Sequence, residues 1–326
     1  MVAGMVIIGG LTRLTGSGLS MVDWAPILGW FPPLSQEEWL ETFNRYQQSP
    51  QYIQVNSDMD VEGFKGIFWL EFIHRLFGRL IGIVFLVPFL YFLVRKKIAP
   101  KLKPKLLAMF VLGALQGGMG WYMVKSGLID NPHVSPYRLT AHLGLAVLIY
   151  GYMMWVGLGL YFNEGTTEKN PLFNTLAIFS SILSGLIFLT LLSGGFVAGL
   201  HAGLIYNTFP LMDGEWIPEG YLAMKPVFLN FFENIATVQW NHRFLAMTTL
   251  LSLLAFGVIA LKKNLPEPIK TALYLLLAMA GIQVTLGILT LLYVVPTALA
   301  SIHQTGAVIL FSFSLFTSHR LCHMRP

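Results

Sequence analysis

The stretch "WLEFIHRLFGRLIG", residues 69–82, opens a long apolar run and carries an unusual group of charges. Glu71, His74, Arg75 and Arg79 fall where a membrane helix is expected to begin. Ionisable side chains at membrane depth cost about 3 kcal/mol or more, and they usually belong to a functional site. The stretch therefore predicts a helix that crosses a bilayer and also carries a site.

The composition of the whole chain is that of an integral membrane protein. Of its 326 residues, 55% are hydrophobic and 11% are charged, and the mean hydropathy is +0.64. Soluble domains carry about 25% charged residues. The net charge of +5 does not indicate nucleic-acid binding, because the basic residues cluster beside apolar runs. Cys322 is the only cysteine, which excludes an intrachain disulfide.

Eight apolar runs approach the length of about 20 residues that a membrane helix needs. They lie near 1–18, 68–94, 105–125, 138–162, 172–200, 238–261, 269–293 and 297–317. The first is short, because Thr12 and Arg13 follow soon after the start, and it suggests a truncated or misassigned N-terminus. The predicted fold class is an all-α integral membrane protein with eight transmembrane helices.

The loops between these runs differ in charge. Lysine and arginine gather in the 95–105 and 262–270 loops, whereas the long 19–67 loop is acidic and the 201–237 loop has one lysine. Cytoplasmic loops carry the excess of basic residues, so both termini are expected on the cytoplasmic or matrix side. Without a recognisable transit peptide, we expect a bacterial inner membrane, with the mitochondrial inner membrane as the alternative.

The second half of the chain repeats the first. The paired segments are "GGLTRLTGSGLSMVDWAP" (9–26) with "GGFVAGLHAGLIYNTFP" (194–210), "EFIHRLFGRL" (71–80) with "QWNHRFLAMT" (239–248), "LQGGMG" (115–120) with "IQVTLG" (282–287), and "TAHLGLA" (140–146) with "SIHQTGA" (301–307). The sequence thus predicts two pseudo-symmetric four-helix bundles, 1–165 and 166–326, in a parallel repeat. Transporters also contain such repeats, so the repeat alone does not choose a function.

Four histidines occupy matching places in this repeat: His74, His142, His242 and His303. Each begins one of the even-numbered spans, so all four are expected at one depth on the outer side. Two histidines on two helices of each bundle predict two bis-histidine haem sites. The remaining histidines are expected in loops or in the tail (His133, His201, His319 and His323).

A small residue follows each membrane histidine on the same helix face (Gly78, Ala146, Ala246 and Ala307). Such residues leave room for a flat ligand, although they also serve helix packing. A single membrane histidine is often a hydrogen-bonded core residue, but four in matching positions favour haem iron as the bound metal. Zinc is less expected, because it favours a tighter cluster with more ligand types.

The two halves differ beside the histidines. Glu71 lies three residues before His74, whereas the matching position before His242 is Gln239. The carboxylate suggests that the first site performs chemistry while the second holds a permanent cofactor or relays electrons. The alternative is that Glu71 only forms an ion pair with a nearby arginine.

Several arginines lie near the outer interface, where they are candidate contacts for haem propionates. These candidates are Arg75, Arg79 and Arg243. Arginines at helix ends also extend toward water for their own solvation, which weakens the assignment.

Long motifs in both halves resemble the haem A synthase family, in the branch shared by mitochondria and alphaproteobacteria. The motifs are "GGLTRLTGSGLSMVDW", "EFIHRLFGRLIG", "GWYMVKSGL", "YRLTAHLG", "VAGLHAGLIYNTFPLM", "QWNHRF" and "ASIHQTGA". The resemblance implies oxidation of the C8 methyl of haem O to the formyl of haem A, by two hydroxylations and loss of water.

The resemblance also implies a role for each site residue. His242 and His303 would ligate a resident haem b, and His74 and His142 would hold the substrate haem O. Glu71 would be an acid/base catalyst or would stabilise positive charge near the reacting methyl. Another branch of the family carries cysteine pairs in its outer loops, and their absence here excludes a thiol-dependent step at those positions.

The pathway implies haem O synthase as a partner, besides the lipid bilayer and an unidentified electron-transfer partner. The sequence leaves the oligomeric state open, a homo-oligomer included. Two other functions compete with the synthase. A di-haem electron-transfer cytochrome b would keep two similar haems, and a haem transporter or chaperone would release haem unchanged.

Overall fold

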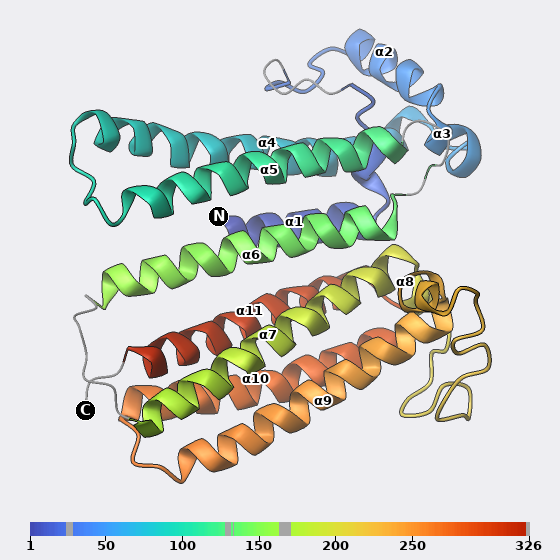
Figure 1. Ribbon diagram of the computed structural model, residues 1–326. Coiled ribbons are helices and arrows are strands. Elements are labelled where there is room, and N and C mark those ends of the chain that lie inside the picture. Colours follow the sequence, from blue (N-terminus) through green and yellow to red (C-terminus); the bar gives the residue numbers. More distant parts are fainter. Residues whose placement is uncertain (24–28, 128–131, 133, 163–170, 324–326) are drawn as a thin grey trace. The chain divides into compact units, whose positions relative to one another are not determined.

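The computed structural model describes residues 1–23, 29–127, 132, 134–162 and 171–323. These residues are mostly helical (Figure 1), in the order α1 (Val2–Leu14), η1 (Ser17–Leu19), α2 (Gln36–Gln47), α3 (Pro50–Val55), α4 (Val61–Val94), α5 (Lys103–Gly127), α6 (Pro136–Tyr161), α7 (Pro171–Gly199), η2 (Ala202–Leu204), η3 (Val227–Leu229), α8 (Asn230–Glu233), α9 (Ile235–Leu261), α10 (Glu267–Leu292) and α11 (Thr297–Cys322). In the described part, helices α4, α5, α6, α7, α9, α10 and α11 are long and apolar enough to cross a membrane, and α1 is a shorter apolar helix. The prediction of an all-α integral membrane protein is confirmed.

Helix α4 begins at Val61, about two turns before the predicted start at residue 68. Asp60 caps it, because its side chain accepts a 2.8 Å hydrogen bond from the backbone N–H of Gly63. The early start was missed because the first two turns are not continuously apolar, and their aromatic residues pack against a loop helix. Helix α4 therefore extends beyond its apolar part.

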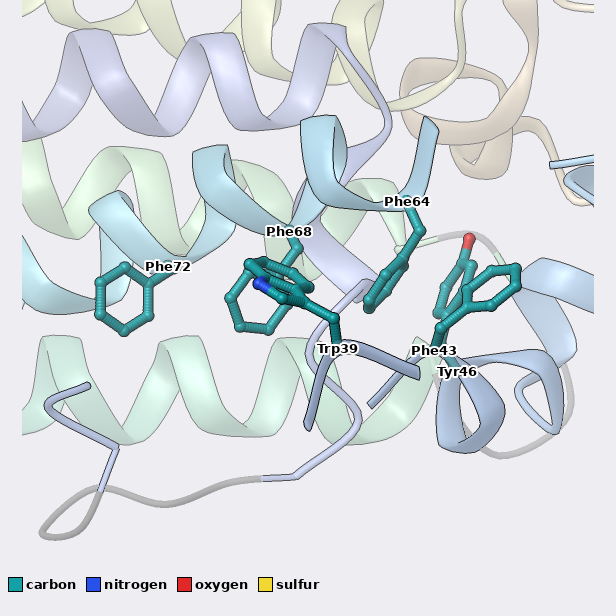
Figure 2. Packing of buried hydrophobic residues seen from close by; sticks show 6 residues of the cluster. All are labelled: Trp39, Phe43, Tyr46, Phe64, Phe68 and Phe72. Atoms are coloured by element: carbon teal, nitrogen blue, oxygen red, sulfur yellow. The ribbon is translucent and has the colours of Figure 1, made fainter. Parts of the chain in front are cut away.

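An aromatic cluster covers this extension (Figure 2). Side chains from α2 and from the start of α4 pack together, and all of them are buried (Trp39, Phe43, Tyr46, Phe64, Phe68 and Phe72). Trp39 meets Phe68 edge-on at 5.0 Å, and Tyr46 stacks on Phe64 at 5.0 Å between ring centroids. Such pairs contribute beyond the apolar area that they bury. The cluster holds α2 against the start of α4.

The cluster is connected to the turn that follows α1. The Tyr46 hydroxyl donates to Gln51 over 3.1 Å, and the Gln51 amide donates to the backbone carbonyl of Gly16 over 2.7 Å. Gly16 has φ of 67°, a left-handed conformation that glycine adopts readily. The aromatic cluster thereby fixes the turn that leads into η1.

Replacing Phe64 by alanine is expected to loosen the packing of α2 on α4. The side chain is fully buried, and removing a buried phenylalanine costs about 3–5 kcal/mol. Limited proteolysis of the folded protein should then cut between residues 29 and 60 much faster than in the wild type. The matched control is Phe31→Ala, since Phe31 is 81% exposed. Equal cleavage of both variants would contradict a stabilising role for the cluster.

The contacts divide the chain into two compact units, Met1–Ile149 and Tyr150–Pro326. In the N-terminal unit, α4 packs against α1 and α5, and η1 contacts α1, α4 and α5. In the C-terminal unit, α7 packs on α9, α9 on α10, α10 on α11, and α11 back on α7. The C-terminal helices therefore form a closed four-helix bundle. The division falls inside α6, and the predicted boundary at 165/166 lies outside the described residues.

The expectation that His319 lies in the tail is wrong. Helix α11 continues to Cys322, and His319 is fully buried, with its ring 4.9 Å from that of Trp155. The helix runs on because Ser314 and Ser318 hydrogen-bond serines of α7, which keeps the last turns packed. His133 lies outside the described residues.

Candidate functional site

The N-terminal unit brings His74 of α4 and His142 of α6 close enough to interact electrostatically. Both side chains are half-buried. Gln116 of α5 sits against His142, with its amide nitrogen 3.2 Å from Nδ1 and donating to the His142 carbonyl over 3.1 Å. The structure thus places both histidines in one unit, and their pairing as haem ligands stays a prediction.

The C-terminal unit repeats this arrangement with His242 of α9 and His303 of α11, which also interact electrostatically. Gln283 of α10 takes the place of Gln116. Its amide nitrogen lies 3.1 Å from Nδ1 of His303 and donates to the His303 carbonyl over 2.9 Å. Ser193 of α7 adds a contact, since its hydroxyl oxygen is 2.7 Å from Nδ1 of His242.

Each of the four imidazoles lies against a glycine of a neighbouring helix. A Cβ added at Gly9 would stand 3.2 Å from His74, and one added at Gly120 would stand 3.1 Å from His142. In the C-terminal unit the corresponding distances are 3.2 Å from Gly194 to His242 and 2.9 Å from Gly287 to His303. Few real Cβ atoms come so close to another group, so each glycine allows its ring to approach the facing backbone.

The space expected after His74 is partly filled in this structure. A Cβ added at Gly78 would stand 3.3 Å from the terminal methyl of Met5. A flexible methionine moves at little cost, so Gly78 still marks an adaptable part of the N-terminal unit.

Glu71 connects the loop after η1 to α4 through hydrogen bonds. Its carboxylate accepts hydrogen bonds from the Ser20 hydroxyl over 2.7 Å and from the backbone N–H of Met21 over 2.8 Å. Arg75 forms a 2.5 Å ion pair with it, and the two side chains are only 9% and 2% exposed. Arg75 also donates to the backbone carbonyls of Met21 and Asp23. The ion pair that was the alternative explanation of Glu71 is therefore present.

Gln239 and Arg243 fasten the loop after η2 in the same way. The Gln239 amide donates to the backbone carbonyls of Ala202 and Ile205 over 2.8 and 2.6 Å. Arg243 donates to Gln239 over 3.2 Å and to the carbonyl of Tyr206 over 2.5 Å. Each unit thus has an equivalent set of loop contacts, which we call the loop clasp. Glu71 and Arg75 form it in the first unit, and Gln239 and Arg243 form it in the second. The first clasp contains a carboxylate and the second a neutral glutamine.

The three arginines considered for propionate binding all donate to backbone carbonyls of loop residues. Arg79 donates to the backbone carbonyl of Gly29 and lies 5.7 Å from the ring of Trp30. Arg75 and Arg243 serve the two loop clasps. Their donors are thus already used in part by backbone carbonyls, and propionate binding stays a prediction.

Sequence reasoning missed the glutamines, Ser193 and the four glycines as site residues. They lie inside the repeated segments, since "LQGGMG" holds Gln116 and Gly120 while "IQVTLG" holds Gln283 and Gly287. The repetition of Gln-x-x-x-Gly was the available signal, because it recurs one helix before a histidine in both halves.

The ligand set fits haem. Among the described residues, no group of three or more histidine, cysteine, aspartate or glutamate side chains is placed to hold a metal ion. Each unit instead offers two imidazoles from two helices, which is the ligand set of a bis-histidine haem. The glycines beside the rings allow the backbones of the neighbouring helices to lie close to the two imidazoles.

Comparison with known proteins identifies relatives along almost the entire chain. The family model of the COX15-CtaA cytochrome oxidase assembly proteins matches residues 1–315. A heme A synthase from Nitrosospira multiformis is 53% identical over 321 residues, which cover 98% of this chain and 90% of that protein. Heme A synthase COX15 from Homo sapiens is 45% identical over 326 residues, covering 98% of this chain and 80% of the human protein.

A plant relative extends the comparison. Heme A synthase COX15 from Arabidopsis thaliana is 44% identical over 331 residues, covering 99% of this chain and 72% of the plant protein. Similarity at this level in bacteria, animals and plants agrees with the resemblance carried by the sequence motifs. The chain therefore belongs to the COX15-CtaA family of cytochrome oxidase assembly proteins.

Proposed function

We propose that this protein is a haem A synthase, a membrane oxidoreductase that converts haem O to haem A for cytochrome oxidase. Family membership along almost the whole chain is the observation that carries the proposal. The paired histidines support it, because each unit offers an axial ligand set for one haem.

We assign the two units different haems. His242 and His303 would hold a resident haem b, which when bound supplies an electron-transfer centre that can take electrons removed from the substrate. His74 and His142 would hold haem O, whose C8 methyl is oxidised by two hydroxylations followed by loss of water. Glu71, a carboxylate that only the N-terminal unit has at this position, supports this division.

Glu71 would act on the substrate by its charge. Its Oε2 accepts hydrogen bonds from the Ser20 hydroxyl and the Met21 N–H, and its Oε1 forms the ion pair with Arg75. A group with this acceptor role suits stabilisation of positive charge that develops near the methyl carbon better than proton transfer. A neutral glutamine in the matching position closes the second clasp, so a clasp of this kind does not in itself need a carboxylate.

The loop charges and the bacterial relatives support a placement in the cell. We propose a bacterial inner membrane, in line with the similarity to a bacterial heme A synthase, with both termini on the cytoplasmic side, because the basic residues concentrate in the 95–105 and 262–270 loops. The two loop clasps and the histidines would then lie toward the outer side. Haem O would come from haem O synthase, and Arg75, Arg79 and Arg243 would contact the haem propionates.

The proposal is tested by producing the protein in cells that make haem O but have no haem A synthase. We expect haem A in extracts from the wild type and none with His74→Ala, while haem b remains bound to that variant. His242→Ala should instead lose haem b. Two retained haems without any haem A would favour the electron-transfer cytochrome, and release of unchanged haem O would favour a transporter.

A further inference from the structure

The hydroxyl of Ser193 lies where it can set which nitrogen of His242 carries the proton. Ser193 has one hydrogen to donate, and its 2.7 Å contact with the backbone carbonyl of Thr190 uses it. With that hydrogen directed to Thr190, the serine oxygen, 2.7 Å from Nδ1 of His242, is placed to accept the Nδ1–H. The lone pair of Nε2 is left free, which is the form in which an imidazole binds iron.

Side-chain contacts hold both rings of the C-terminal unit. Ser193, which donates to the Thr190 carbonyl, contacts Nδ1 of His242, and the amide nitrogen of Gln283 lies 3.1 Å from Nδ1 of His303. Thr190 is fixed in turn by a 2.8 Å hydrogen bond between its hydroxyl and that of Thr249. Partners of this kind fix the orientation of an axial ligand.

The N-terminal unit lacks the serine. The offset that pairs Gly9 with Gly194 places Ile8 opposite Ser193, and each glycine touches the ring of its own histidine, which confirms this register. No hydrogen bond to the ring of His74 is found in the part of the chain that the structure describes. That ring also faces its glycine through Nε2, whereas His242 faces its glycine through Cε1. His74 is thus not held as His242 is.

Helices α4 and α5 of the N-terminal unit are also less closely packed than the helices of the C-terminal unit. Within the most apolar window of each helix, none of the α4 residues and 6% of the α5 residues are buried. In the C-terminal unit the values are 33% for α7, 28% for α9, 17% for α10 and 33% for α11, and α6, which carries His142, reaches 28%. A loosely packed pair of helices rearranges at a lower cost than a close-packed bundle does.

We propose that Ser193 is a positioning residue that fixes the ring of His242 for binding to a haem which the protein keeps. Ile8, at the matching position, offers the ring of His74 no hydroxyl, so that the N-terminal unit can release its haem. This inference rests on the proposed function, because it explains how one fold retains one haem and turns over another. It adds a physical cause, because the Ser193 hydroxyl is a contact of His242 that Ile8 does not supply to His74.

The first test measures haem release from the purified holoprotein, made in cells that contain haem b but no haem O, to haem-free myoglobin. Second-shell partners typically contribute about 10- to 100-fold in metal affinity, so Ser193→Ala should release haem faster by about that factor. The control Ser181→Ala removes a hydroxyl on the same helix that bonds only the Ala177 carbonyl, and it should match the wild type. Ser193→Thr keeps a hydroxyl and should restore slow release.

A second readout separates positioning from general loosening. The hydrogen bond from Nδ1 makes the imidazole a stronger donor to iron and so favours ferric haem. Its loss in Ser193→Ala should raise the midpoint potential, whereas Ser181→Ala should leave the potential unchanged. Unchanged release and potential in Ser193→Ala would overturn the inference while leaving the proposed function intact.

The reverse substitution tests the N-terminal unit. In cells that make haem O, Ile8→Ser should copurify with more haem A and deliver less of it to the membrane than the wild type does. Release of haem A at the wild-type rate would overturn this half of the inference. A wild-type protein that carries no haem b and makes no haem A would overturn the proposed function, and the inference with it.

Discussion

Glu71→Gln is expected to lower haem A formation by about 100-fold or more while haem b stays bound to the C-terminal unit. Removing one preorganised electrostatic group from an active site typically costs about 10²–10³-fold in rate. The measurement is chromatography of haems extracted from cells that make haem O, together with the haem b content of the purified variant. Unchanged haem A would contradict a chemical role for Glu71.

The substitution also disturbs the loop clasp, and the experiment must separate the two effects. A glutamine amide has one acceptor oxygen and one NH₂ group that only donates, so its NH₂ would face either the Met21 N–H or Arg75, which are donors themselves. Breaking a buried ion pair from one side costs about 3–5 kcal/mol. Some loss of loop order is therefore expected in Glu71→Gln regardless of any role in the chemistry.

Ser20→Ala supplies the matched control, because it removes one hydrogen bond of the clasp and keeps the carboxylate. Glu71→Asp keeps the charge on a shorter side chain. If Glu71 acts by its charge, Ser20→Ala should retain most of the haem A output and Glu71→Asp should retain more than Glu71→Gln. Equal losses in Ser20→Ala and Glu71→Gln would reduce Glu71 to a structural role.

Hydropathy was enough to locate the long helices, because apolar length is a one-dimensional property of the chain. The predicted span 238–261 agrees with α9, Ile235–Leu261. The same reasoning missed the start of α4, where Asp60 caps the helix and aromatic residues pack against α2. Caps and loop packing depend on residues outside the apolar run, so hydropathy does not report them.

The histidine pairs could be predicted because the repeat places them in matching positions. The groups that hold the rings could not be predicted, because they depend on which face of one helix meets which face of another. Ser193 and His242 are 49 residues apart in sequence, and Gln116 and His142 are 26 apart. The contacts of Glu71 with Ser20 and Met21 likewise join segments about 50 residues apart, which only the folded chain brings together.

Substituting the glycines beside the histidine rings is also expected to have a large effect on haem binding. Gly287→Ala would place a Cβ 2.9 Å from Cε1 of His303, and α10 and α11 are packed too closely to accept it without a shift. We expect the purified variant to lose most of its haem b, because a displaced axial ligand weakens haem binding by about 10-fold or more. Gly281→Ala on the same helix meets nothing within 4 Å and should bind haem b normally.

The same change in the N-terminal unit should have a different consequence. Gly120→Ala would bring a Cβ to 3.1 Å from Cε1 of His142, whereas a Cβ at Gly118 meets nothing within 4 Å. Gly120→Ala is expected to stop haem A formation and to keep haem b, and Gly118→Ala should do neither. Alanine favours a helix by about 1 kcal/mol over glycine. A loss of bound haem b or of haem A formation in Gly287→Ala or Gly120→Ala must therefore come from the contact of the new Cβ with the histidine ring. Loss of haem b in Gly120→Ala would show that the two units do not hold separate haems, which would contradict the division of labour proposed for them.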